Sequence, residues 1–481
     1  MNEAEIAHKV LSGLKWKAFI RVLGQVISWA ISIVVIRYIK PEEYGLKSMA
    51  DIFMAVVMIF SSGGLQSAII QTKELTEEKL KKIFGILIII NLILFVFIFL
   101  GAYPIAKYYN EPKIISLIQV MSVGFLLVPL NIMPSALFSR DMEYKEVSSI
   151  SFTTNVIGGV CTLIMAVMGY GVWSLIAGPL LSSALSVIIL NIYKPCLKKP
   201  DFSMHGMFDV VSFGGTVLLT SFLWIVFSKA DVFIAGGVLS AKDVGVYAVA
   251  LHLASLPIDK IMPVLNQVAF PAYAKLQDNP LQIAKYFLKS IRLTSLILFP
   301  VSFGLVGISH YLIPALLGDK WNDVIPLFFV LGLVFPLRGI STLCAPMTNA
   351  IGKPKVQLQL VVLGVLLMVP SFIFAINYGA LGLALTWAIV YPVIVFINLV
   401  NSIRRINLKI FHVVKAVFAP IFVSSVMLVG LLMFYMTNVI IVNHWFTIGV
   451  MILSGAVFYI LGMLLLSKKT LYEMAGLFSS R

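Results

Sequence analysis

Three apolar segments of the chain carry charged and amide side chains at helical spacing. Within each segment these residues recur every three, four or seven positions, so they share one face of a helix. The sets are Arg21, Gln25, Ser28 and Ser32; His252, Asp259 and Asn266, with Lys260 adjacent; and Arg338, Ser341, Thr342 and Asn349. Two further apolar segments carry Asp51, Lys229 and Asp231. Such residues can line a water-filled cavity, bind a charged solute or carry an ion.

The overall composition makes charged and amide side chains within these segments unusual. Of the 481 residues, 60% are hydrophobic and only 12% are charged, and the mean hydropathy is +1.00. Because a soluble chain carries about 25% charged residues, the sequence indicates a polytopic membrane protein and excludes a soluble or disordered one. We attribute the net charge of +15 to membrane topology, and we expect no nucleic-acid partner.

Fourteen apolar runs are long enough to cross a bilayer as helices, which takes about 20 residues. They cover residues 14–39, 44–71, 83–107, 114–138, 149–168, 172–193, 209–236, 244–272, 286–309, 324–351, 356–376, 380–402, 411–436 and 445–467. Of the 36 Lys and Arg residues, 26 fall in the termini and loops of one side, seven in the loops of the other and three within spans. Since positive residues mark the cytoplasmic side, we expect both termini in the cytoplasm.

A charge at the bilayer centre costs about 2.5–3.5 kcal/mol on insertion scales, so charged residues within spans should face water or protein. We therefore expect a cavity lined by Arg21, Gln25, Lys229, Asp231, His252, Lys260 and Arg338. Asp259 and Asp51 are the candidates for binding a coupling ion, either a proton or sodium. In the alternative, structural interpretation, Lys229–Asp231 and Asp259–Lys260 are ion pairs buried between helices, and Arg21 extends to the cytoplasmic interface.

An internal repeat relates the two halves of the chain. Residues 39–45 follow the first span and residues 239–245 follow the seventh, and both segments end in glycine. Similar glycine-containing connections occur at residues 168–175 and 377–383. Spans 1–6 and 7–12 therefore form two copies with the same orientation, as in transporters with parallel repeats. We expect an N-lobe at 1–205, a C-lobe at 206–405, and two additional spans with a cytoplasmic tail at 406–481.

Catalytic and metal-binding patterns are missing from the sequence. It contains no GxxxxGK[ST], HExxH or GxSxG motif, its loops are short, and Cys161, Cys196 and Cys344 are scattered. We expect no catalytic residue, no metal site and no cofactor, and so a carrier and not an enzyme.

An ordered set of short motifs resembles those of the Wzx-type bacterial polysaccharide flippases, which export lipopolysaccharide, exopolysaccharide or teichuronic acid units. The set comprises residues 11–16, 37–45, 64–71, 138–142, 229–231, 245–248, 256–257 and 270–278. The resemblance covers residues 1–355 and continues beyond them by hydropathy.

The resemblance implies the all-α fold of the multidrug/oligosaccharidyl-lipid/polysaccharide superfamily. That fold has 14 transmembrane helices, arranged as two pseudo-symmetric six-helix lobes plus two extra C-terminal helices, which could hold a lipid tail in a groove. It also implies a cargo, a polyprenyl-diphosphate-linked oligosaccharide moved by alternating access from the cytoplasmic to the outer leaflet of the bacterial plasma membrane. Membrane lipid, a coupling ion and glycan polymerase or assembly proteins are the implied partners.

The cationic cavity of that family is matched here by Arg21, Lys229, Lys260 and Arg338. Arg and Lys suit a diphosphate in a dehydrated site, and the hydroxyl and amide groups suit a sugar. A multidrug or peptidoglycan-precursor exporter of the same superfamily is the alternative, although a pump for cationic drugs should have an acid-dominated cavity. A membrane glycan polymerase or ligase would need a sizeable outer loop with catalytic residues, which the sequence lacks.

Overall fold

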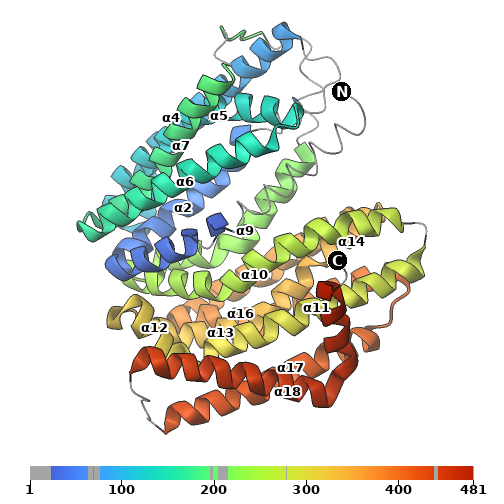
Figure 1. Cartoon of the computed structure of the whole chain (residues 1–481). Helices are drawn as coiled ribbons and strands as arrows, with labels where there is room; N and C mark the ends of the chain where they lie inside the picture. Colours follow the sequence, from blue (N-terminus) through green and yellow to red (C-terminus); the bar gives the residue numbers. More distant parts are fainter. Residues whose placement is uncertain are drawn as a thin grey trace. The chain divides into compact units, whose positions relative to one another are not determined.

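The computed structural model describes residues 23–25, 27–62, 69, 76–195, 199–203, 215–277, 279–437 and 443–479. All regular structure within these ranges is helical, as predicted, and the chain forms two compact units (Figure 1). Unit 1 is Met1–Gly245 and unit 2 is Val246–Arg481. Arg21 lies outside the described residues.

Twelve helical runs in the described part of the chain are long and apolar enough to cross a membrane. One of them, Lys355–Ile406, contains two successive helices, and a shorter apolar helix covers Leu23–Tyr38. The boundaries lie close to the predicted ones: the span expected at 324–351 is the run Val324–Ala350, and the span expected at 172–193 is Gly171–Tyr193. Hydropathy therefore located the long apolar helices of the described residues, whereas the number of fourteen spans stays a prediction.

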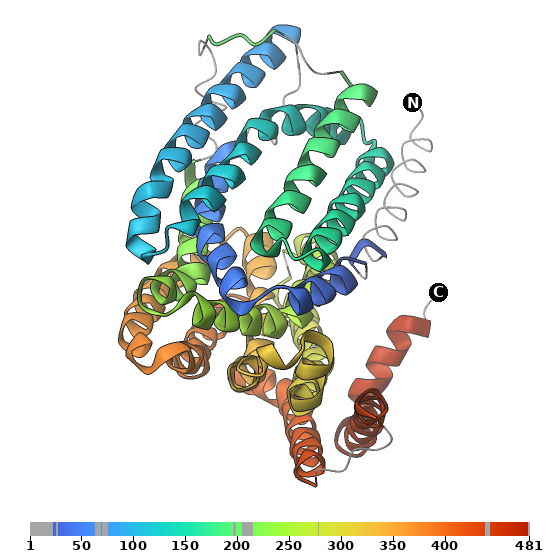
Figure 2. The ribbon, with the colours of Figure 1, turned by 90° about the vertical axis from the view of Figure 1, so that its left-hand side faces the viewer.

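Unit 1 is a bundle in which α4 packs on α5 and α6 packs on α7 (Figure 2). After Leu23–Tyr38 its helices are α2 (Pro41–Ser62), α4 (Glu77–Tyr109), α5 (Lys113–Arg140), α6 (Tyr144–Val167), α7 (Ser174–Tyr193), α9 (Gly215–Val238) and the start of α10 (Ala241–Lys275). Local signals set the ends of α4. The Thr76 side chain accepts a hydrogen bond from the Lys79 amide at its start, and left-handed Asn110 ends it.

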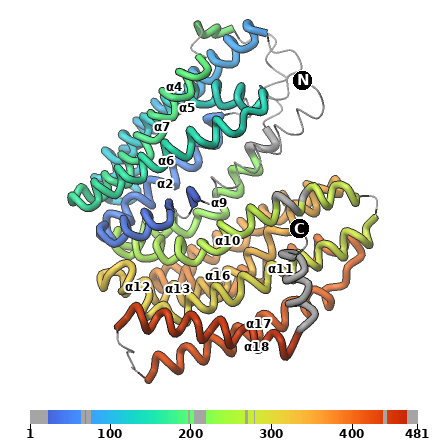
Figure 3. The backbone as a smooth tube through the Cα atoms, in the orientation of Figure 1, coloured from blue at the N-terminus to red at the C-terminus, as the bar shows by residue number. Residues whose placement is uncertain are grey.

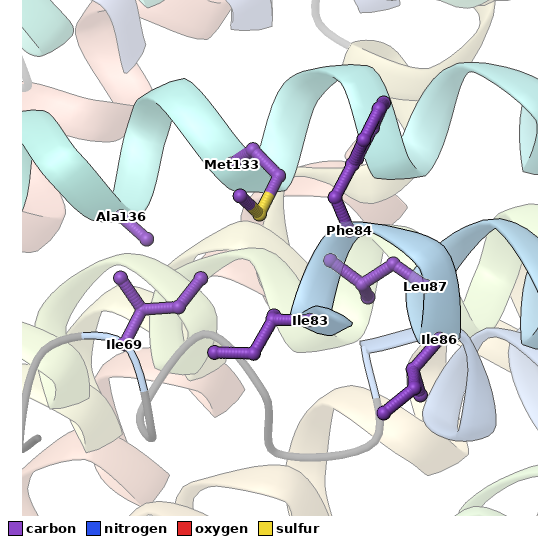
Figure 4. Close-up of a cluster of buried hydrophobic side chains, with 7 residues drawn as sticks. All are labelled: Ile69, Ile83, Phe84, Ile86, Leu87, Met133 and Ala136. Atoms are coloured by element: carbon purple, nitrogen blue, oxygen red, sulfur yellow. The ribbon is translucent and has the colours of Figure 1, made fainter. Parts of the chain in front are cut away.

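A buried apolar cluster joins α4 to α5 at one end of unit 1 (Figure 4). Its members are Ile69, Ile83, Phe84, Ile86, Leu87, Met133 and Ala136. Farther along α4, the Asn91 amide donates hydrogen bonds to the carbonyl oxygens of Ser61, at 2.8 Å, and Leu87, at 2.9 Å. This polar contact ties α4 to the end of α2 inside an apolar bundle.

Small residues let α6 and α7 approach closely. A Cβ atom added to Gly178 would lie 1.8 Å from the Thr162 hydroxyl, and one added to Gly158 would lie 2.6 Å from the Gly178 carbonyl oxygen. The Ser182 hydroxyl donates to the Asn155 side chain across the same interface at 2.9 Å. This is the small-residue packing with interhelical hydrogen bonds that stabilises helix pairs in lipid.

The two copies of the repeated loop motif meet within unit 1, at the first turns of α2 and α10. A Cβ on Gly45 would lie 1.8 Å from the Ala241 carbonyl oxygen, and a Cβ on Gly245 would lie 1.9 Å from the Pro41 carbonyl oxygen. The contact is reciprocal, and its partners are 200 positions apart in the sequence. The glycines of the repeat are therefore required for a close backbone crossing.

The described part of unit 2 contains the rest of α10 and eight further α-helices. These are α11 (Pro280–Gly307), α12 (Ser309–Leu317), α13 (Val324–Thr342), α14 (Cys344–Ala350), α15 (Lys355–Ala375), α16 (Gly379–Ile403), α17 (Ile410–Met436) and α18 (His444–Ser479). Helix α11 packs on α13 and α17, and α17 packs on α18 (Figure 3). The Tyr459 hydroxyl of α18 donates to the Leu296 carbonyl of α11 at 3.1 Å.

Helix α9 belongs to unit 1, where it packs on α2. The lobe boundary at 205/206 was derived from the sequence repeat, which is a different criterion from packing, and it stays a prediction. The same holds for the separate segment 406–481, whose helix α17 packs extensively on α11 within unit 2.

Candidate functional site

The predicted cavity residues are distributed over both units. Gln25, Lys229 and Asp231 belong to unit 1, and His252, Lys260 and Arg338 belong to unit 2. Their convergence on a single cavity stays a prediction, as does the part expected of Arg21. Within each unit, the burial and the contacts of these residues indicate different roles for them.

On α9, Lys229 is exposed and Asp231 is completely buried. Residues two apart on a helix point about 200° away from each other, so α9 presents the two side chains in opposite directions. The Asp231 carboxylate accepts a hydrogen bond from the Val232 amide at 2.7 Å, which helps to satisfy a buried charge. Gln25 is half-buried. Lys229 is thus a predicted cation of unit 1 that is open to a ligand.

The two acidic candidates for ion coupling differ in their surroundings. Asp51 of α2 forms an ion pair with Lys47, one helical turn before it. Asp259 of α10 is exposed, and the neighbouring Lys260 is half-buried. A carboxylate with a lysine already in contact is the weaker candidate for exchanging an ion, so the comparison favours Asp259.

Arg338 of α13 lies against two aromatic side chains. Its guanidinium carbon is 5.6 Å from the ring centroid of Phe335 and 6.0 Å from that of Trp387, which projects from α16. The two rings meet edge to face at 5.6 Å. Both rings are buried, while Arg338 is half-buried. A cation over aromatic rings at these distances is attracted to the ring electrons, so the rings hold the guanidinium group at the edge of the unit 2 core.

Hydrogen bonds fix the surroundings of Arg338. The indole nitrogen of Trp387 donates to the Tyr247 hydroxyl at 3.2 Å, which holds the ring in place. On the next turn of α13, the Ser341 hydroxyl accepts a hydrogen bond from the Asn398 amide of α16 at 2.7 Å. We call Arg338, Phe335, Trp387, Tyr247, Ser341 and Asn398 the Arg338 site.

The Arg338 site draws its residues from α10, α13 and α16, and the glycine beside Arg338 packs against α11. A Cβ on Gly339 would lie 2.1 Å from a methyl carbon of Leu298 on α11 and 3.7 Å from the sulfur of Met262 on α10. Helix α13 also packs on α16. A larger residue beside Arg338 would therefore require the Leu298 side chain to move.

The sequence patterns identified only the α13 side of this site. Arg338 and Ser341 were predicted from their helical stripe, whereas Trp387, Tyr247 and Asn398 were missed. A signal for two of them exists: Trp387 and Asn398 are eleven positions apart, so they share one face of an otherwise apolar span.

The Arg338 site is equipped for binding. It offers one permanent cation held by rings, together with hydroxyl and amide groups that suit a polar, anionic ligand. Among the described residues, no group of three or more His, Cys, Asp or Glu side chains is placed to hold a metal ion.

Comparisons with known proteins point to one family. Residues 34–326, more than half of the chain, match the family model described as "Polysaccharide biosynthesis protein". The chain is 25% identical over 388 residues to the lipopolysaccharide biosynthesis protein WzxC of Escherichia coli K12, covering 80% of this chain and 79% of that protein. It is 24% identical over 434 residues to the teichuronic acid biosynthesis protein TuaB of Bacillus subtilis 168, covering 88% of each.

Solved structures share the fold. The lipid II flippase MurJ, in an inward closed conformation, superimposes with a TM-score of 0.77 at 15% identity, over 95% of this chain and 99% of that one. An inward-facing multidrug resistance transporter of the MATE family superimposes with a TM-score of 0.63 at 16% identity, over 80% of this chain and 94% of that one. These likenesses confirm the expected all-helical, polytopic fold, whereas the number of fourteen spans and the division into lobes stay predictions.

Proposed function

Because the chain belongs to the polysaccharide biosynthesis protein family and shares its fold with a lipid II flippase and a multidrug transporter, we propose that it is a flippase for a lipid-linked polysaccharide unit. The cargo is a polyprenyl-diphosphate-linked oligosaccharide, and it moves by alternating access from the cytoplasmic to the outer leaflet of the plasma membrane. The named relatives support this class of cargo, since their names refer to lipopolysaccharide and teichuronic acid.

The observation that carries the proposal is the position of Arg338. A guanidinium group within a membrane span is expensive unless it has a partner or a function, and here it lies against Phe335 and Trp387. Being half-buried, it remains open to a ligand on one side. A diphosphate offers pairs of oxygens that match the fork of a guanidinium group. In the proposed role, Arg338 binds the diphosphate, and nearby hydroxyl and amide groups bind the first sugar.

The proposal includes a topology of fourteen spans. Separating α15 from α16 within the run Lys355–Ile406 adds one span to the twelve, and counting the shorter apolar helix Leu23–Tyr38 as a span adds another. An even number places both termini on one side, and the Lys and Arg bias assigns that side to the cytoplasm. We further propose Asp259, the more exposed of the two acidic candidates, as the site of the coupling ion.

The test uses vesicles containing the purified full-length protein and a fluorescent polyprenyl-diphosphate oligosaccharide. Arg338→Ala should reduce its movement between leaflets at least tenfold. Arg338→Lys should recover only part of the rate, because lysine keeps the charge and loses the paired hydrogen bonds. Lys355→Ala, which removes an exposed cation at the start of α15, is the matched control and should transport normally.

Two results would count against the proposal. Normal transport by Arg338→Ala at equal protein content would show that Arg338 has a structural role. Movement of cationic drugs but not of the lipid-linked oligosaccharide by the unmodified protein would instead support a multidrug exporter of the same fold.

A further inference from the structure

Uncharged polar side chains lie at the middle of two neighbouring membrane helices of unit 1. Asn155 is at the middle of α6 and Ser183 is at the middle of α7, and both residues are exposed. The Ser182 hydroxyl of α7 donates to the side-chain oxygen of Asn155 at 2.9 Å, so the two helices bring these residues to the same level. Because Asn155 accepts this bond with its oxygen, its exposed amide nitrogen can serve a ligand.

An apolar stripe marks the side of α6 that faces lipid. It consists of Ile157, Val160 and Ile164, which are exposed by 42%, 42% and 54%. These three residues lie about 140–180° around the helix from Asn155. Polar side chains within membrane helices face the protein interior or water and not lipid. The position of Asn155 fits this rule, and its exposure is on the side of α6 away from lipid.

Helix α7 repeats this arrangement. Its exposed apolar stripe consists of Leu181, Ile188 and Ile192, which also lie about 140–180° around the helix from Ser183. Each of the two helices therefore combines an apolar stripe for lipid with an exposed polar residue at mid-span on the opposite side. Since α6 packs on α7, the two polar residues belong to one surface of unit 1.

The helix Leu23–Tyr38 packs beside α6 and runs in the same direction. A Cβ on Gly24 would lie 3.2 Å from the ring of Phe152, and a Cβ on Gly159 would lie 2.9 Å from a methyl carbon of Ile31. The two contacts have the same offset in sequence, so residues 27 and 28 are level with Asn155.

The polar stripe of this helix lies on the same side of the contact as Asn155. Ser28 is exposed, and Gln25 and Ser32 are half-buried. Ser28 lies about 40–60° after the positions that contact α6 in the direction of helix rotation, and Asn155 lies about 40–60° before the positions of α6 in the same contact. Because parallel helices rotate in the same sense, these two displacements lead to the same side. We call Gln25, Ser28, Ser32, Asn155 and Ser183 the Asn155 face.

The chemistry of the Asn155 face suits a sugar. The face offers two amide and three hydroxyl groups, and each of these groups can both donate and accept hydrogen bonds. Gln25 and Ser32 are seven positions apart, or about 10 Å along the helix axis, which exceeds the width of one sugar ring. A diphosphate or a cationic drug would be bound best by opposite charges, whereas the hydroxyl groups of an oligosaccharide need donors and acceptors distributed over such a length.

We infer that the Asn155 face binds sugar residues of the cargo oligosaccharide. The inference rests on the proposed function, because it takes the cargo to be a lipid-linked oligosaccharide. It adds a sugar-binding surface in unit 1 to the diphosphate-binding role proposed for Arg338 in unit 2. The amide group of Asn155 and the hydroxyl groups of Ser28 and Ser183, the exposed members of the face, make the contacts.

The experiment compares two lipids that differ only in their sugars. The thermal stability of the full-length protein in detergent is measured during titration with polyprenyl-diphosphate-linked oligosaccharide or with polyprenyl diphosphate without sugars. A ligand that binds only the folded protein raises the melting temperature as its occupancy increases. The unmodified protein should bind the lipid with sugars more tightly than the lipid without them.

The test variant is Asn155→Leu, Ser182→Ala, Ser183→Ala. Removing Ser182 together with its acceptor leaves no hydroxyl without a partner between α6 and α7, which limits the loss of stability. Affinity for the lipid-linked oligosaccharide should fall about 25-fold, or about fivefold for each of the two lost ligand contacts. Affinity for polyprenyl diphosphate should not change.

Three control variants separate sugar binding from packing and from diphosphate binding. Thr153→Val removes an exposed hydroxyl group from the apolar side of α6 and should bind both lipids normally. Ser182→Ala alone breaks the hydrogen bond between α6 and α7 but retains Asn155 and Ser183, so it should keep most of the affinity for the oligosaccharide. Arg338→Ala should weaken the binding of both lipids alike, because both contain the diphosphate.

Several outcomes would overturn the inference and leave the proposed function intact. They are equal affinity of the unmodified protein for the two lipids, undiminished oligosaccharide binding by the test variant, and an equal loss of affinity for both lipids in that variant, which would indicate a structural role. If the unmodified protein binds neither lipid, the proposed function fails, and the inference fails with it.

Discussion

The crossing of α2 and α10 in unit 1 gives the sharpest mutational prediction. Gly45→Ala adds a Cβ atom 1.8 Å from the Ala241 carbonyl oxygen. Contacts of a Cβ below 3.0 Å are essentially never observed, so the two backbones must separate by more than 1 Å locally. The obstacle is a backbone oxygen, which cannot rotate away as a side chain could.

The expected cost follows from two opposing effects. Overpacking of this kind costs about 1–3 kcal/mol, and a backbone obstacle places it toward the upper end. Replacing a helical glycine by alanine gains up to about 1 kcal/mol through helix propensity. The net destabilisation should be about 1–2 kcal/mol. Gly101→Ala on α4 is the matched control, because a Cβ there would have no atom within 4 Å, and it should leave stability unchanged or slightly raised.

The reciprocal contact adds a second, stricter test. Gly245→Ala would place a Cβ 1.9 Å from the Pro41 carbonyl oxygen and should cost about as much as Gly45→Ala. Once one alanine has separated the helices, the second meets less resistance, so the double variant should lose less stability than the two single variants combined.

Thermal denaturation of the detergent-solubilised variants, followed by size-exclusion chromatography of a fluorescent fusion, measures these differences. Each single variant should melt several degrees below the unmodified protein and the Gly101→Ala control. If Gly45→Ala melts together with that control, the close crossing does not exist. Strictly additive effects of the two alanines would mean that the glycines do not share one contact.

Further predictions concern the helix ends and the site. Desolvation lowers the pKa of Lys194, but its hydrogen bonds to Asp141 and Glu143 outweigh this effect, so the pKa is raised overall. The contact of Lys194 with the two carboxylates should therefore stabilise the protein at pH values below the ordinary lysine pKa of about 10.4. This stabilisation should be lost as the pH rises through the raised pKa of Lys194. Lys194→Ala should lower stability by about 1 kcal/mol in a melting assay at neutral pH, and should remove this alkaline dependence. Trp387→Leu should weaken transport of the lipid-linked oligosaccharide in vesicles without changing membrane insertion, since the guanidinium group loses one of its two rings; unchanged transport would exclude a role for that contact. Reporter fusions after Lys199 and Arg481 should both indicate the cytoplasm, and an external signal from either would contradict the charge-based topology.

Much of the fold follows from hydropathy because the bilayer imposes a length on its helices. A window of about 20 apolar residues is sufficient to predict α5 or α17 to within a few residues. The nine-residue helix α12 escapes this reasoning because it is too short to span. The close crossing at Gly45 and Gly245 was visible only as a repeat, since nothing in a single sequence shows that two matching glycines touch.

The Arg338 site could be predicted from the sequence only for the residues that lie on a single helix. The stripe containing Arg338 and Ser341 could be derived from spacing, because both residues lie on α13. The contributions of Trp387 and Asn398 depend on α16 packing against α13, and a single sequence does not report which helices are neighbours. The same limitation applies to Lys229 and Asp231, whose opposite environments on α9 depend on what covers each face.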